Sequence, residues 1–136
     1  MARALKARGY APSRILCSTA RRTLQTAEAV LKAAPAPIAY LESLYLAPPG
    51  RLMALAQDAA DDDAALMIVG HNPGLEQCAA ILARAPVRPR QQHRQDAMEE
   101  KFPTAALAVL DFDIVRWKQL SPSAGYLVDF VRPRDL

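Results

Sequence analysis

The sequence predicts an α/β fold, a three-layer sandwich in which a mostly parallel sheet is flanked by helices. Short apolar runs alternate with helix-length amphipathic stretches over residues 13–82. Residues 102–132 then hold further strand-like runs with no helical pattern between them. Alternation is typical of parallel strands joined by helices, and consecutive strands are typical of antiparallel pairs. We therefore expect a parallel sheet followed by an antiparallel C-terminal part.

Length and composition indicate one globular domain over residues 1–136. The chain is 51% hydrophobic and 23% charged, and its net charge of +3 permits an anionic ligand without indicating nucleic acid. Cys17 and Cys78 lie beside apolar runs, so we expect buried reduced thiols and no disulfide framework. No apolar run reaches the roughly 20 residues of a membrane span, and we predict a cytoplasmic protein with no membrane partner.

The first half of the chain predicts alternating helices and strands. Gly9 ends a first helix, and Ser18 or Thr19 caps a second one. Residues 61–63 (Asp-Asp-Asp) are interpreted as a solvated turn rather than a metal site, because three adjacent carboxylates cannot all point at one ion. In order, we expect the end of a helix over residues 1–8, a strand over 13–18, a helix over 20–34, a strand over 38–41 and a helix over 51–60.

The second half predicts one more strand and helix, a loop, and closing strands. Asn72 is expected to cap the fourth helix, with Pro73 at its first position. Residues 84–101 are polar and charged, which favours a mobile loop; an RNA-binding arm is the alternative, but four arginines without aromatic partners support it poorly. We expect a strand over residues 65–69, a helix over 73–82 and strands over 102–112, 117–120 and 126–132.

His71 lies in residues 70–74 (Gly-His-Asn-Pro-Gly), between a buried strand and the start of a helix. Ligands of α/β sheets bind at the carboxyl ends of strands, and a helix N-terminus favours anions. A histidine in that position can transfer a proton near neutral pH. The alternative is a tight turn with an incidental histidine, and the local sequence leaves both interpretations open.

Arg21 and Arg22 occupy the first turn of the second helix, where positive charge is unfavourable by about 0.3–1 kcal/mol per residue. Such a placement indicates a site that gathers positive charge for an anion, and the arginine fork matches phosphate oxygens. The two residues lie about 100° apart on the helix, so we expect one to face a site and Arg21 to remain in solvent. A Cys-x5-Arg phosphatase loop is excluded, because Thr23 stands six residues after Cys17.

Together these stretches resemble the histidine phosphatase superfamily, and specifically its SixA-type phosphohistidine phosphatase branch. The similar segments run in order through nearly the whole chain. They are residues 17–28 (Cys-Ser-x-Ala-x-Arg-Thr-x-Gln-Thr-Ala-Glu), Leu44-Tyr45, residues 69–76 (Val-Gly-His-Asn-Pro-Gly-Leu-Glu), 103–108 and 127–136.

The resemblance implies phosphoryl transfer through a phosphohistidine intermediate. By motif position, Arg22 and His71 would hold the phosphoryl oxygens, and Glu42 would protonate the leaving group. Ser18, Asn72 and Thr104 would be substrate-binding residues. Guanidinium and imidazolium groups would supply the positive charge, so neither a metal nor another cofactor is expected. The implied partner is a phosphorylated protein or small phosphorylated molecule, and the oligomeric state stays open.

The sequence departs from this family at its start. The family's nucleophile is a histidine in an N-terminal Arg-His-Gly motif, whereas this chain holds only His71 and His93, the latter expected in solvent. Either the start is misplaced or shortened, which we favour because Arg22 and His71 persist, or the chain is a natural remnant. We thus expect an N-terminally truncated domain without its first strand, with two unpaired strand edges and no ordinary activity. The alternatives are a non-catalytic phosphate-binding remnant and an interaction module that uses residues 84–101.

Overall fold

Three parallel strands form the larger sheet of the computed structural model, which describes residues 2–135. They are β1 (Arg14–Ser18), β2 (Ile38–Leu41) and β3 (Leu66–Val69), in the order β2-β1-β3. Cys17 lies opposite Tyr40 on one side and Val69 on the other. Since the strands are parallel, their carboxyl ends meet at one edge of the sheet, where Ser18 and the chain after Val69 lie side by side.

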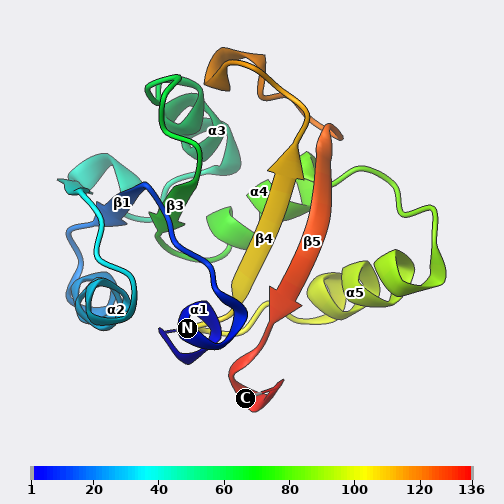
Figure 1. Ribbon diagram of the computed structural model, residues 1–136, viewed down its shortest axis with the longest axis horizontal. Helices are drawn as coiled ribbons and strands as arrows, with labels where there is room; N and C mark the ends of the chain where they lie inside the picture. Colours follow the sequence, from blue (N-terminus) through cyan, green and yellow to red (C-terminus); the bar gives the residue numbers. More distant parts are fainter. Residues whose placement is uncertain (1, 136) are drawn as a thin grey trace.

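A separate antiparallel pair consists of β4 (Leu107–Phe112) and β5 (Gly125–Val131), with an irregularity between Val109 and Leu110. The α/β class and the antiparallel C-terminal part are confirmed. The strands, however, form two sheets and not one, because β3 pairs only with β1 and β4 only with β5 among residues 2–135. Figure 1 shows the two sheets with the β4–β5 pair standing beside β3.

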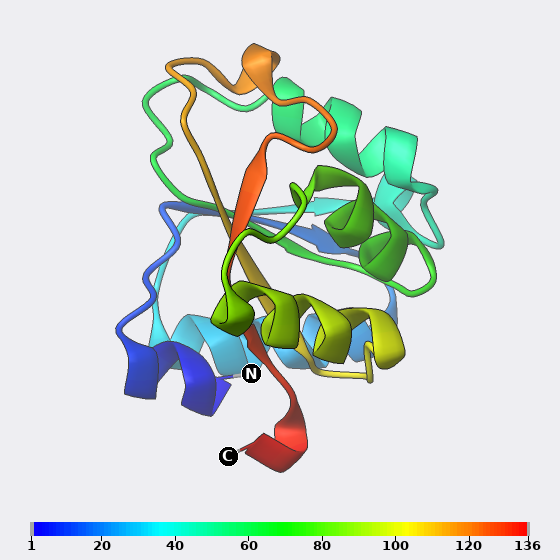
Figure 2. The same cartoon turned by 90° about the vertical axis from the view of Figure 1, so that its right-hand side faces the viewer.

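Helices cover both faces of the parallel sheet. On one side α1 (Ala2–Arg8) contacts α2 (Arg21–Ala33), and on the other α3 (Pro49–Gln57) contacts α4 (Gly74–Leu82). A fifth helix, α5 (Pro89–Glu100), packs on β5. Figure 2 shows the strands of the parallel sheet edge-on between these two layers. No helix within residues 2–135 is long and apolar enough to cross a membrane.

The core consists of three clusters of buried side chains, because the alternation along the strands sends neighbours to opposite faces. Ile15 and Cys17 of β1 join the cluster under α1 and α2, whereas Leu16 joins the cluster under α3 and α4. A third cluster, around Met98 and Phe130, joins α5 to β5. Both cysteines are buried and unpaired, as predicted.

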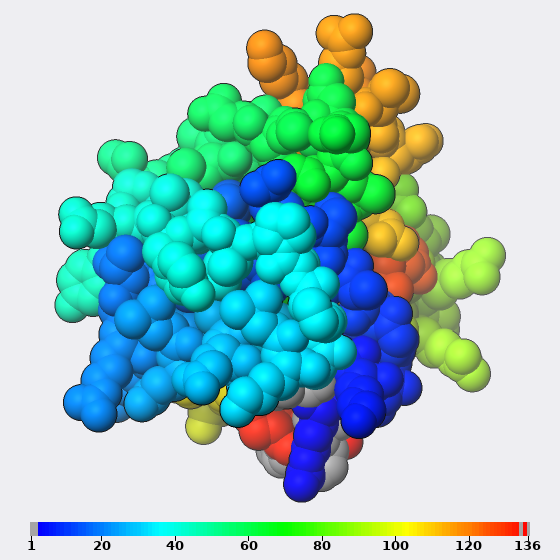
Figure 3. Space-filling view, turned by 60° about the vertical axis from the view of Figure 1, so that its left-hand side comes forward, coloured from blue at the N-terminus to red at the C-terminus, as the bar shows by residue number. Residues whose placement is uncertain are grey.

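The chain between α1 and β1 is attached to β5 by Asp129. The Asp129 carboxylate accepts hydrogen bonds from the Arg8 guanidinium at 2.8 and 2.9 Å and from the Tyr10 hydroxyl at 2.8 Å. Burial, followed by the hydrogen bond to Asp129, raises the pKa of Tyr10. In the space-filling view of Figure 3, the dark blue surface of this segment lies against the lighter blue and cyan surface of α2 and the chain that follows it.

The prediction of a loop over residues 84–101 is wrong, because twelve of these residues form α5. Pro89 begins the helix with a φ already suited to it, and the Gln91 side chain accepts hydrogen bonds from the Val87 and Arg88 N–H groups. The helix carries one buried side chain, Met98, on an otherwise polar surface. So few apolar positions leave almost no helical period in the sequence.

The closing strands and the helix caps also differ from expectation. Residues 117–120 were predicted as a strand, but Trp117–Gln119 form the 3-10 helix η2, in which the Trp117 indole donates to Asp63 O at 2.7 Å. The strand predicted from residue 102 begins only at Leu107, after a turn with Ala105 at φ 65. Ala20 caps α2, and Pro73 caps α4.

Candidate functional site

Ser18 and His71 meet at the carboxyl edge of the parallel sheet. Ser18 ends β1 and is fully buried, and His71 lies two residues beyond the end of β3. His71 Nε2 lies 2.8 Å from Ser18 Oγ across 53 residues of chain, so the two atoms share one proton in a hydrogen bond. The parallel pairing of β1 with β3 brings the two side chains together.

Thr23 and the start of α2 hold Ser18 in place. Ser18 Oγ accepts a hydrogen bond from the Ala20 N–H at 3.3 Å, and Ser18 O lies 2.8 Å from the Thr23 hydroxyl. The Thr23 hydroxyl also lies 2.7 Å from Ala20 O, and the side chain is buried. The sequence analysis did not single out Thr23; a threonine in the first turn of a helix, where side chains bond nearby backbone, is the available signal.

Tyr45 packs against the other side of His71. The two rings meet edge to face, with centroids 5.2 Å apart and an interplanar angle of 77°. Tyr45 follows the 3-10 helix η1 (Glu42–Leu44), and its side chain is 59% exposed. Ser18 and Tyr45 thus contact the imidazole of His71, which is half-buried.

Arg22 and His71 line the same cavity. This cavity has a volume of about 950 Å³, and Arg22, His71, Asn72 and Thr104 all belong to its lining. Arg22 is the second residue of α2, is exposed, and its guanidinium makes no hydrogen bond or ion pair with any residue in 2–135. The neighbouring Arg21 is exposed and does not line the cavity.

Of the other three predicted site residues, Asn72 and Thr104 line the cavity and Glu42 does not. Asn72 is exposed, and its side-chain amide donates to Phe102 O at 2.8 Å instead of capping α4. Thr104 is exposed and also lines the cavity. Glu42 is exposed after β2, does not line the cavity, and makes no side-chain hydrogen bond within residues 2–135. The structure therefore places Arg22, His71, Asn72 and Thr104 in the lining of one large cavity, joins Ser18 to His71 by a hydrogen bond, and leaves Glu42 outside that lining.

This group of side chains presents hydrogen-bond donors rather than ligands for a cation. A guanidinium, an imidazole and an amide lie next to a helix N-terminus, which is a setting suited to an oxyanion. Across residues 2–135, no group of three or more His, Cys, Asp or Glu side chains could hold a metal ion. Asp63 of the acidic turn bonds Arg14 at 2.7 Å, and Asp61 accepts the Trp117 N–H at 3.3 Å.

Comparison with known sequences gives uncharacterized mycobacterial relatives. The chain is 34% identical over 130 residues to an uncharacterized protein of Mycobacterium tuberculosis. The aligned region covers 96% of this chain and 79% of that protein. It is 32% identical over 121 residues to an uncharacterized protein of Mycobacterium leprae, with 89% and 71% of the two chains covered. No family model matches the sequence.

Three solved structures share the fold. A protein assigned as the phosphohistidine phosphatase SixA of Agrobacterium tumefaciens is 30% identical, with a TM-score of 0.74 over 97% of this chain and 75% of that one. The corresponding protein of Nakamurella multipartitia is 25% identical, with a TM-score of 0.77 over 97% and 77%. A protein histidine phosphatase SixA complexed with tungstate has the same fold, with a TM-score of 0.73 at 22% identity. The 30% identity to the Agrobacterium tumefaciens protein, over 97% of this chain and 75% of that one, shows that this chain belongs to the histidine phosphatase superfamily, in its SixA-like branch.

Proposed function

We propose that Arg22, His71 and Ser18 form a site for the phosphoryl group of phosphohistidine in a protein, or of a small phosphorylated molecule. The observation that carries this proposal is the His71–Ser18 hydrogen bond at 2.8 Å, since His71 lines a cavity whose lining also includes Arg22, which has no side-chain partner among the described residues. A phosphoryl group presents three oxygens that share negative charge, and guanidinium and imidazole donors bind such oxygens strongly.

Each residue has a role in this proposal. The Arg22 fork takes two phosphoryl oxygens, and His71, oriented by Ser18, takes the third. Asn72 and Thr104 contact the substrate, whereas Glu42, which does not line the cavity, has no role in this binding. The SixA-like fold supports the phosphoryl chemistry. The two buried thiols fit a reducing compartment, for which we propose the cytoplasm.

A site that binds a phosphoryl group does not necessarily hydrolyse it. A phosphohistidine intermediate needs a histidine nucleophile besides the one that binds the oxygens, and this chain contains His71 and His93. His93 is exposed on α5 and does not line the cavity. We therefore propose that the chain of 136 residues binds phosphoryl groups without hydrolysing them at an ordinary enzymatic rate of about 1–1000 per second.

A titration with oxyanions tests the binding site. Inorganic phosphate and tungstate, added to isotope-labelled chain, are expected to shift the resonances of Gly70, His71 and the first turn of α2. Arg22→Ala is expected to weaken binding by about ten- to a hundredfold, because a charge-assisted hydrogen bond contributes about 1.5–3 kcal/mol. Arg21→Ala is the matched control and is expected to change the affinity by less than about twofold. Equal effects of the two substitutions would contradict the proposed site.

An assay with phosphoramidate or a phosphohistidine peptide tests the statement about turnover. The expected result is binding without phosphate release above the uncatalysed rate. Hydrolysis at an ordinary rate would refute the proposed inactivity while leaving the binding site intact. The titration therefore tests the binding site, and the assay tests the absence of hydrolysis, independently of each other.

A further inference from the structure

Leu46 occupies a turn position that favours glycine. The turn runs from Leu44 to Ala47, and the Ala47 N–H closes it by donating to Leu44 O at 3.3 Å. Tyr45 has φ −64° and ψ 117°, and Leu46 has φ 48°, which corresponds to a type II turn. The third residue of such a turn needs a positive φ, which is unfavourable for leucine and open to glycine. Backbone geometry therefore does not explain why this residue is a leucine.

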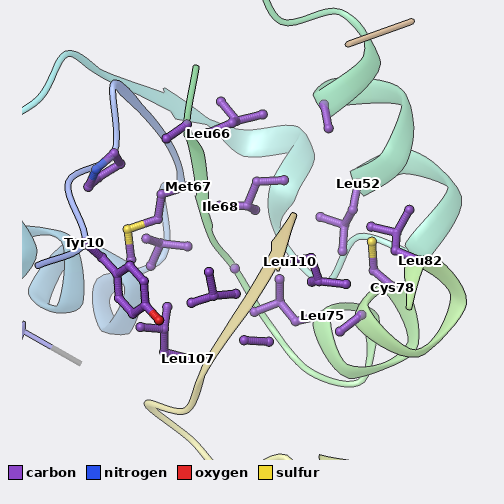
Figure 4. A pocket seen from close by; sticks show the side chains of 18 of the residues that line it. Tyr10, Leu52, Leu66, Met67, Ile68, Leu75, Cys78, Leu82, Leu107 and Leu110 are labelled. Carbon is purple, nitrogen blue, oxygen red and sulfur yellow. The ribbon is translucent and has the colours of Figure 1, made fainter. Parts of the chain in front are cut away.

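Packing in the core does not explain the leucine either. The Leu46 side chain is 59% exposed and belongs to none of the three buried clusters. By contrast, Leu52 of α3 and Leu75 of α4 line the interior of the cavity, where Figure 4 shows their side chains. The core thus takes these two leucines and leaves Leu46 at the surface. An unfavourable backbone conformation that brings the chain no buried contact indicates a functional role for the side chain.

Leu46 lies beside the turn that carries His71. The residue before it, Tyr45, contacts the His71 ring edge to face, with centroids 5.2 Å apart. The carbonyl of the residue after it, Ala47, packs against Gly74 so closely that a Cβ on Gly74 would overlap it. Tyr45 and Leu46 are each 59% exposed, and neither lines the cavity. We call these two residues, which are exposed next to the His71 turn, the apolar pair.

We propose that Leu46 determines specificity at the phosphoryl site by contacting an apolar group that the substrate carries next to its phosphoryl group. This inference rests on the proposed function, because Arg22 and His71 must first hold the phosphoryl oxygens. The part of the substrate beyond the phosphorus then lies outside the cavity, against the apolar pair. The substrate class is thus a phosphorylated compound with an apolar or aromatic group beside the phosphorus.

The chemistry of the apolar pair disfavours hydroxyl-rich substrates. The Leu46 side chain has no polar atom, so the hydroxyl groups of a sugar phosphate would lose water against it without gaining a hydrogen bond. An apolar group instead removes its own surface and that of Leu46 from water. Covering the exposed part of one leucine in this way is expected to raise affinity by about five- to thirtyfold.

Two phosphonates with different organic groups test the inference on the full chain. Phenylphosphonate and methylphosphonate carry the same anionic group, and their carbon–phosphorus bond resists hydrolysis. At a pH where both are dianions, isothermal titration is expected to show about five- to thirtyfold tighter binding of phenylphosphonate. Equal affinities would overturn the inference and leave the phosphoryl site intact. If neither phosphonate binds, the proposed function is refuted, and this inference with it.

Substitutions at Leu46 test whether this side chain causes the preference. Leu46→Asn keeps a side chain of similar length and tolerates a positive φ, but it is polar. It is expected to reduce the preference for phenylphosphonate to less than about twofold, whereas the apolar Leu46→Met is expected to keep it. The control is Val87→Asn, at an 84% exposed apolar residue between α4 and α5, which is expected to change neither affinity. A preference that survives Leu46→Asn would contradict the inference.

Urea unfolding separates recognition from a structural role of Leu46. Leu46→Gly removes the side chain and suits the positive φ, so its unfolding midpoint is expected to be at least as high as that of the unchanged chain. Val87→Gly is the control, since the φ of Val87 is not positive, and it is expected to lower the midpoint. If Leu46→Gly lowers the midpoint more than Val87→Gly does, Leu46 serves stability, and the inference is wrong.

Discussion

Gly74 packs against the Ala47 carbonyl so closely that no side chain fits between them. A Cβ on Gly74 would overlap Ala47 O, which is backbone and cannot move aside without shifting the chain between η1 and α3. Gly74 begins α4, so this contact determines how close the turn that carries His71 lies to the residues after Tyr45. The glycine thereby supports the arrangement of the site without touching a ligand.

We expect Gly74→Ala to destabilise the chain by about 2 kcal/mol or more, since backbone has to move to accept the methyl group. Gly70→Ala is the control, because a Cβ there meets only the Leu75 side chain at 3.7 Å, an ordinary contact. Gly70→Ala is expected to lower the free energy of unfolding by less than about 1 kcal/mol. Urea unfolding of the two variants measures the difference, and similar midpoints would contradict the prediction.

Ser18→Ala is expected to weaken phosphate binding by about five- to tenfold. The substitution removes the hydroxyl that bonds His71 Nε2, and a neutral hydrogen bond contributes about 1 kcal/mol. Ser43→Ala, at an exposed serine of η1, is expected to leave the affinity unchanged. Isothermal titration of inorganic phosphate into the three proteins provides the measurement.

Tyr45→Ala is expected to reduce phosphate affinity by about two- to tenfold with little loss of stability. The edge-to-face contact orients His71 and contributes about 0.5–1.5 kcal/mol, whereas the tyrosine itself is 59% exposed. Tyr40→Ala replaces a similarly exposed tyrosine, 49% exposed, on β2. Should Tyr40→Ala weaken binding as much as Tyr45→Ala, the ring contact with His71 is not the cause.

Stability is expected to fall in alkali partly because of Tyr10. Burial and the hydrogen bond to Asp129 raise its pKa in the folded chain above the ordinary value of 10.0. The folded state thus holds the phenol proton more tightly, so this contribution is complete below pH 10 and is lost as the pH rises through the folded pKa. Between neutral pH and the pH at which folded Tyr10 loses its proton, the Tyr10→Phe variant is expected to lose less stability than the unchanged protein. The free energy of unfolding of both proteins, measured against pH, provides the check. If it falls equally steeply in the two proteins, Tyr10 is not the source of the loss.

The thiols of the native chain are expected to react slowly with iodoacetamide. Burial raises the pKa of Cys78 to about 11 and also raises that of Cys17. For Cys78 a shift from 9.0 to about 11 lowers the thiolate fraction about a hundredfold, and the thiolate is the reactive form. Cys17→Ser isolates Cys78, and urea is expected to restore its ordinary rate. Fast labelling without urea would show that the cavity admits the reagent readily.

The sequence by itself determined the α/β class, the positions of β1, β2 and β3, and the turn that carries His71. Each of these rests on local periodicity and on glycine or proline at an element end, which operate over a few residues. The similar segments that run in order from residue 17 to residue 136 also indicated the family, which comparison over almost the whole chain then confirmed.

Tertiary structure decided the rest. The hydrogen bond between Ser18 and His71 depends on β1 pairing with β3, and the contact of Tyr45 with His71 depends on where α4 packs. Helix α5 packs on β5 with one buried side chain, Met98, so no hydrophobic period in its own residues predicts it. Local propensity acts along the chain, whereas pairing and burial act between segments that are distant in sequence, so only the folded arrangement reveals them.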